Sequence, residues 1–138
     1  MNNLRFVLDT NVIVSAALVV GSIPRQALNK ALDLGKLLIS AATVVELDDV
    51  LRRNCFDKYL TEEERLVFLA ALVKEGELVD ITDACSDCRD PKDNKFLELA
   101  LSARATCIIS GDADLLILHP FRGAIPVVTP QVFLTMAW

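Results

Sequence analysis

Short apolar runs recur along the chain, separated by longer stretches that carry apolar residues at helical spacing. The runs lie at residues 5–8, 37–39, 78–81, 107–109 and 125–128. A short apolar run bounded by polar residues is typical of a buried strand. Because strands that alternate with helices form a parallel sheet covered on both faces, the pattern predicts an α/β fold with about five parallel strands.

Helix boundaries are marked by residues with clear local preferences. Pro24 suits the first turn of a helix, Thr61 and Glu64 form a capping box, and Gly35 suits a helix end. We expect the first strand to be central and the last to be an edge strand, because Pro126 has no amide hydrogen for a ladder. The expected helices cover residues 12–18, 24–34, 43–53, 61–75, 90–105, 113–118 and 129–136.

Length and composition indicate one globular domain spanning residues 1–138. The chain has 53% hydrophobic and 24% charged residues, which is typical of a folded protein. We expect a cytoplasmic protein, because no apolar stretch is long enough to cross a membrane and no basic and apolar leader precedes the first strand. The net charge of −5 argues against coating nucleic acid by bulk electrostatics, but not against an enzyme that acts on it.

The four cysteines do not form a recognisable zinc or redox motif. Cys85 and Cys88 have CxxC spacing, but His119 is the only histidine available to complete a zinc site. A redox CxxC opens a helix directly after a strand, whereas this one falls in a polar loop. We therefore expect free thiols.

Acidic residues follow two of the predicted strands. Asp9 ends the first strand, and Asp112 and Asp114 follow the fourth strand after a turn at Gly111. The carboxyl ends of parallel strands share one edge of a sheet, which is where such sheets bind ligands. If the two strands are neighbours, these carboxylates lie close together.

Two further acids belong to predicted helix starts. Glu46 lies at the start of the helix that follows the second strand, which places it at the same edge; Asp93 begins the helix before the fourth strand, and its placement follows less directly. Each acid also has a simpler explanation: Thr43 and Glu46 match a capping box, as do Asp90 and Asp93. The aspartates after the strands equally suit an Asx turn or a helix cap.

Several carboxylates at one sheet edge point to a divalent cation. Like charges a few ångströms apart do not all remain ionised without a counter-ion. Oxygen ligands in this number suit Mg²⁺ or Mn²⁺, and no serine, histidine or cysteine arrangement offers a competing nucleophile. Acids and metal alone suit the metal-assisted hydrolysis of a phosphodiester.

These motifs resemble the PIN domain family in order and spacing, across essentially the whole chain. They are Asp9-Thr10-Asn11-Val12, Glu46-Leu47, residues 93–100 and residues 110–116. The likeness is closest to small bacterial single-domain toxins of toxin–antitoxin systems. It implies a three-layer α/β/α sandwich, Mg²⁺- or Mn²⁺-dependent cleavage of single-stranded RNA, and an antitoxin partner.

The resemblance also implies roles for individual residues. Asp9 and Asp112 would bind the metal with Asp93 close by, and Glu46 would act through water. Asp114 matches an extra acid of flap-nuclease relatives. The remaining candidates are Asn11 and Ser110 beside the acids, and Lys95 and then Lys92 for a substrate phosphate, although solvated surface charge also explains the lysines.

Other interpretations remain open. The same fold is compatible with a catalytically silent module that binds nucleic acid or protein. Two phosphotransfer folds are disfavoured. A receiver needs a lysine after a later strand, and a haloacid-dehalogenase-type phosphatase needs an Asp-x-Asp directly after the first strand; the sequence has neither arrangement, and its Asp-x-Asp comes late. Leu47, Val50 and Leu51 would form a dimer face if they were exposed, and core packing explains them equally well.

Overall fold

The computed structural model, which describes residues 3–138, contains a five-stranded sheet. All neighbouring strands are parallel, and their order is β3-β2-β1-β4-β5. The expected α/β fold is confirmed, with the first strand in the centre and the fifth at an edge. The strands are β1 (Arg5–Leu8), β2 (Lys36–Ile39), β3 (Glu77–Leu78), β4 (Cys107–Ile109) and β5 (Val127–Val128).

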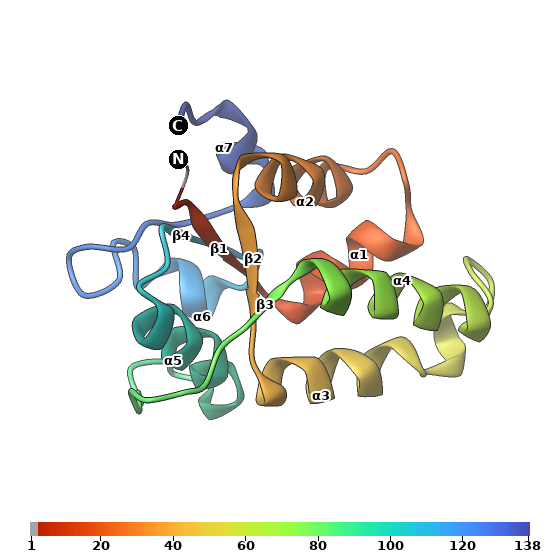
Figure 1. The fold of residues 1–138 in the computed structure, drawn as a ribbon, viewed down its shortest axis with the longest axis horizontal. Helices are drawn as coiled ribbons and strands as arrows, with labels where there is room; N and C mark the ends of the chain where they lie inside the picture. Colours follow the sequence, from red (N-terminus) through yellow and green to blue (C-terminus); the bar gives the residue numbers. More distant parts are fainter. Residues whose placement is uncertain (1–2) are drawn as a thin grey trace.

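Helices cover both faces of this sheet (Figure 1). On one side lie α1 to α4 and α7, and on the other lie α5 and α6. The helices are α1 (Thr10–Leu18), α2 (Ile23–Leu34), α3 (Ala41–Leu51), α4 (Glu62–Glu75), α5 (Asn94–Ala103), α6 (Ala113–Leu116) and α7 (Pro130–Thr135), with 3₁₀ turns η1 (Asn54–Phe56) and η2 (Pro91–Asp93).

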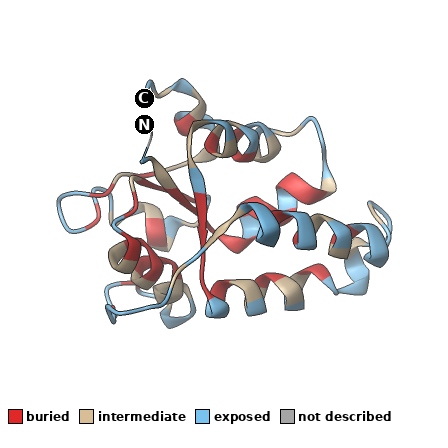
Figure 2. Ribbon diagram, viewed as in Figure 1, coloured by how far each residue is buried: buried red, intermediate tan, exposed pale blue. Residues whose placement is uncertain are grey.

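Successive strand residues alternate between two apolar clusters. Phe6 and Leu8 pack with α1 to α4, whereas Val7 packs with α5 and α6. Because both faces are covered, all three side chains are buried. Figure 2 shows the buried residues gathered on the strands and on the helix faces that meet them.

Two helix boundaries differ from the sequence expectation. The helix expected to open at Asp90 and Pro91 is instead the turn η2 followed by α5, which begins at Asn94. The helix expected from Thr43 begins at Ala41, because Ser40 is its N-cap. Each shift moves a candidate acid relative to the start of its helix.

The apolar residues of α3 do not form the dimer face considered from the sequence. Leu47 and Leu51 belong to the core, and Val50 packs against it.

The close approach of backbone segments requires glycine at Gly35 and not at Gly111. At Gly111 an added Cβ meets no atom within 4 Å. At Gly35 a Cβ would lie 2.0 Å from the Leu4 carbonyl oxygen, so only glycine lets β1 and the start of β2 approach.

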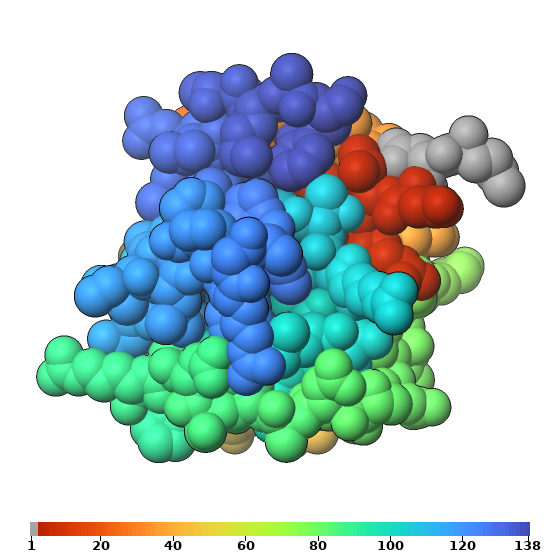
Figure 3. Space-filling model, turned by 90° about the vertical axis from the view of Figure 1, so that its left-hand side faces the viewer, coloured from red at the N-terminus to blue at the C-terminus, as the bar shows by residue number. Residues whose placement is uncertain are grey.

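The segment between β3 and α5 lies across the α5 side of the molecule. Figure 3 shows it in green, below the blue segment that follows α6. Arg122 joins the two segments through an ion pair with Asp87 at 3.0 Å. Cys85 and Cys88 are buried there, and neither forms a disulfide bond.

No single helix within residues 3–138 combines the length and the apolar composition needed to cross a membrane. Helices α1 and α2 meet that test only as a pair, and the chain bends by 107° between them.

Candidate active site

Four acidic residues from separate segments line one cavity at the carboxyl edge of the sheet. Asp9 follows β1 and Asp112 follows β4, and these strands are neighbours. Glu46 reaches the cavity from α3 and Asp93 from the end of η2. The cavity has a volume of about 180 Å³ and is also lined by Thr10, Asn11, Val50, Arg53 and Phe96.

Asp9 is held on both carboxylate oxygens. Its Oδ1 accepts a hydrogen bond from the Val12 amide at 2.9 Å, and its Oδ2 accepts one from the Ser110 hydroxyl. Burial raises the pKa of Asp9 above its ordinary value of 3.8, and these hydrogen bonds partly oppose that rise. The Ser110 oxygen also accepts from the Asp112 amide at 2.9 Å, so one buried hydroxyl links the ends of β1 and β4.

Asp93 has the most perturbed carboxyl group of the cavity. Burial, the adjacent Asp112 carboxyl group, and the charges of Asp90 and Glu46 raise the pKa of Asp93 to about 7. Its Oδ2 atom is buried and accepts no hydrogen bond from any donor in residues 3–138. The Asp112 carboxyl group can form a hydrogen bond with it only if one of the two groups carries a proton. This oxygen therefore lacks the hydrogen-bond donor or cation that a buried carboxylate oxygen needs.

Glu46 is held by two partners from opposite sides of the cavity. The Thr10 hydroxyl donates to its Oε2, and the Lys95 ammonium donates to its Oε1 at 2.8 Å. Lys95 also donates to the backbone carbonyl of Lys92. Lys95, a candidate for binding a substrate phosphate, is therefore engaged with an acid of the cavity. Lys92 is exposed and does not line the cavity.

Helix capping explains two of the acids and not the other two. Asp9 caps α1, and Asp112 caps α6 by accepting from the Asp114 amide. The capping box of α3 joins Ser40 with Thr43, so Glu46 does not have the capping role considered from the sequence. Asp93 makes no side-chain cap bond at the start of α5. The cavity-facing carboxylates of Glu46 and Asp93 therefore lack that simpler explanation.

The structure adds residues to the site and leaves one predicted acid outside it. Asp114 does not line the cavity, whereas Asn11 does so from an exposed position. Arg53 was not chosen as a site residue from the sequence, although it stands seven positions after Glu46 and so on the same face of the helix expected over residues 43–53. In the structure α3 ends at Leu51, before Arg53. Thr10 was also missed, although it lies within the Asp9-Thr10-Asn11 motif.

Arg65 fixes the segment that carries Arg53. Its guanidinium is fully buried and donates to three backbone carbonyls, those of Leu51 at 2.7 Å, Arg53 at 3.2 Å and Leu60. It also pairs with Asp57 at 3.1 Å. These bonds satisfy carbonyl groups at the end of α3, which have no partner within the helix.

The donor types suit a hard divalent cation. Four carboxylates and no thiol or imidazole line the cavity, and Asp93 Oδ2 lacks a partner within residues 3–138. In the same residues, no three acidic, histidine or cysteine side chains are arranged to hold an ion as they stand. The carboxylates must therefore draw closer to ligate an ion together, against their mutual repulsion.

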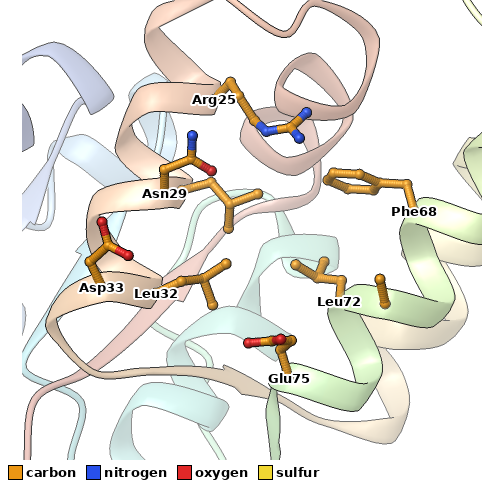
Figure 4. A pocket seen from close by; sticks show the side chains of 9 residues that line it. Arg25, Asn29, Leu32, Asp33, Phe68, Leu72 and Glu75 are labelled. Carbon is orange, nitrogen blue, oxygen red and sulfur yellow. The ribbon is translucent and has the colours of Figure 1, made fainter.

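A larger hollow lies elsewhere, between α2 and α4. It has a volume of about 550 Å³, and Figure 4 shows Arg25 of α2 reaching toward Phe68 of α4. The Arg25 guanidinium lies 5.4 Å from the centre of that ring. Asp33 and Glu75 approach from opposite helices, and the rest of the lining is mostly apolar. The cavity with convergent acids is thus the better candidate for catalysis.

The chain is similar to proteins of known sequence and of known structure. A protein of Methanocaldococcus jannaschii described as the uncharacterized protein MJ1680 is 30% identical over 118 residues, covering 84% of this chain and 76% of that protein. DNA-bound VapBC from Salmonella typhimurium contains a similar fold, with a TM-score of 0.59, 17% identity, and coverage of 92% of this chain and 98% of that one.

VapBC2 from Rickettsia felis, bound to a DNA fragment from the promoter, also contains this fold. Its TM-score is 0.58 at 15% identity, with coverage of 90% of this chain and 98% of that one. The family model described as the PIN domain matches residues 5–114, which include all four cavity acids. The chain therefore belongs to the PIN domain family.

Proposed function

We propose that this chain is a divalent-metal-dependent endoribonuclease that cleaves single-stranded RNA and serves as the toxin of a toxin–antitoxin pair. The observation that carries the proposal is the convergence of Asp9, Glu46, Asp93 and Asp112 on one cavity. Membership of the PIN domain family supports the nuclease activity. The similar folds found in VapBC assemblies support a protein partner.

Asp9, Asp93 and Asp112 are the residues that would hold Mg²⁺ or Mn²⁺. The bound ion supplies an acidified water and neutralises charge that develops on the phosphate. Ser110 orients Asp9 and the turn that carries Asp112 through its two hydrogen bonds. Glu46 accepts the proton of the attacking water, in an orientation set by its hydrogen-bond partners.

The cavity suits one phosphodiester group of a flexible strand. Its volume of about 180 Å³ accommodates a phosphate group, and a flexible single strand can turn a phosphate inward. Asn11 and Arg53 are positioned at the cavity to contact that phosphate. Arg53 pairs with Asp49 at 3.3 Å across an exposed surface, a weak interaction that a phosphate can replace.

The decisive experiment is a cleavage assay on mixed single-stranded RNA with Mn²⁺ and with EDTA. We expect cleavage with Mn²⁺, its loss with EDTA, and its loss in the Asp9→Asn and Asp112→Asn variants. Asp33→Asn is the matched control, because Asp33 lies in the other hollow. Full activity in the Asp9 and Asp112 variants would refute the assignment. RNA binding without cleavage would favour the silent binding module.

The toxin role and the oligomeric state need separate measurements. Expression of the wild-type chain in bacteria should arrest growth, and expression of Asp9→Asn should not. Unimpaired growth with a nuclease that is active in vitro would refute the toxin role alone. We also propose a homodimer, which sedimentation at micromolar concentration tests directly; its contact must lie outside the buried residues of α3.

A further inference from the structure

Lys95 is a lysine whose charge is fixed beside Glu46, one of the acids of the cavity. Its ammonium donates to Glu46 Oε1 at 2.8 Å and to the Lys92 carbonyl, and it lies 5.7 Å from the centre of the Phe96 ring. The Lys95 side chain is only 21% exposed. Surface lysines usually point into water and move freely, so three fixed contacts indicate a defined place for this charge.

The four acids of the cavity differ in how far their charge is compensated. Both oxygens of Glu46 are engaged, one by Lys95 and one by the Thr10 hydroxyl. The other three acids, Asp9, Asp93 and Asp112, form what we call the aspartate end, and the buried Oδ2 of Asp93 has no partner within residues 3–138. The uncompensated negative charge therefore lies with the aspartates.

We propose that the Lys95 ammonium takes the place of a second divalent cation, so that the cavity binds one metal ion per chain at its aspartate end. This inference rests on the proposed function, because it assumes that the carboxylates hold a metal.

Charge balance supports a single ion. One divalent ion together with the ammonium leaves the four carboxylates with one negative charge in excess, which a hydrated site accommodates. Two divalent ions would reverse the sign and would place a doubly charged ion beside the ammonium. Paired metal ions in two-metal sites lie about 3.5–4 Å apart. Repulsion from an ammonium over such a distance is strong in a partly buried cavity.

The test counts bound Mn²⁺ in the absence of RNA. The free-ion signal in electron paramagnetic resonance gives the number of ions bound by the wild type and by Lys95→Met. We expect one ion in the wild type and two in Lys95→Met, because the variant keeps most of the apolar stem and loses the charge. Lys95→Arg should bind one ion, since it keeps the charge. Lys92→Met should also bind one, because it removes a neighbouring charge that is exposed and keeps the ion pair of Lys95 with Glu46.

Two ions in the wild type, or one in Lys95→Met, would overturn the inference and leave the nuclease proposal intact. No bound Mn²⁺ in the wild type would overturn both. Circular dichroism establishes that each variant is folded. If Lys95→Met does not fold, Lys95→Gln replaces it, with the same two-ion expectation and the same overturning result.

Discussion

Replacing Asp93 with asparagine should stabilise the metal-free protein while it removes a proposed metal ligand. The wild-type carboxylate is placed against Asp112 with an oxygen that accepts no hydrogen bond from residues 3–138. Asparagine has nearly the same shape and carries no charge, and its side-chain amide can donate a hydrogen bond to the Asp112 carboxylate. The change therefore relieves repulsion and supplies a missing donor.

The size and the sign of the expected change in the free energy of unfolding follow from the raised pKa of Asp93. Between about pH 4 and pH 7 the unfolded chain releases this proton while the folded chain keeps it, so the free energy of unfolding falls as pH rises. A rise in pKa from 3.8 to about 7 corresponds to at most about 4 kcal/mol. Because solvent reaches part of the carboxyl group and screens its charge, we expect Asp93→Asn to raise the free energy of unfolding by about 1–2 kcal/mol.

Thermal unfolding in EDTA at pH 4 and at pH 8 measures this effect. At pH 8 we expect Asp93→Asn to unfold about 3–7 °C above the wild type, given the entropy of unfolding of a domain of this length. At pH 4 the difference should shrink, because the wild-type carboxyl group is then protonated in the folded state and no longer repels Asp112. Asp33→Asn is the control for a lost negative charge. Equal stability at pH 8, or a gain of the same size at pH 4, would refute the reasoning.

Three further predictions concern Arg65, two glycines and Ser110. Arg65→Met should lower the free energy of unfolding in urea by about 3 kcal/mol, since it removes the donor of the buried Leu51 carbonyl and the other bonds that Arg65 makes to this segment; Arg65→Lys should not restore it. Gly35→Ala should cost at least about 2 kcal/mol because its Cβ meets Leu4, whereas Gly111→Ala should change stability by less than about 0.5 kcal/mol. Ser110→Ala should reduce RNA cleavage at least about tenfold, and Ser110→Thr is the conservative comparison.

The fold was predictable because the decisive signals are local. The apolar runs and the Thr61 capping box can be recognised in the sequence, and each run contributes one strand to the sheet. The boundaries near Ser40 and Asn94 were not predicted. Ser40 and Thr43 are both common capping residues, and the structure uses Ser40 as the cap and Thr43 as its partner. Asp90 caps the turn η2 rather than α5 itself, and the apolar pattern does not distinguish the two.

The candidate site was predictable where strand ends determine it, and less so elsewhere. Asp9 and Asp112 converge because β1 and β4 are neighbours. Glu46 was placed at the right edge, but on the mistaken premise that it lies in the first turn of its helix. The pairing of Lys95 with Glu46 joins residues 49 positions apart, and a pattern along the chain does not reveal such a contact. The roles of these residues remain predictions.

The buried Arg65 has a consequence for how the site adapts to a substrate. The segment after α3 is fastened through backbone carbonyls, so Arg53 stands on a wall that opens only if a guanidinium is left unpaired in the interior. The facing wall, η2 and the start of α5, is joined to α3 by the partly exposed ion pair of Lys95 with Glu46. Such a pair holds less firmly than the buried bonds of Arg65. When a bulky nucleotide binds, we therefore expect the α3 wall to keep its shape and any adjustment to occur on the η2 side.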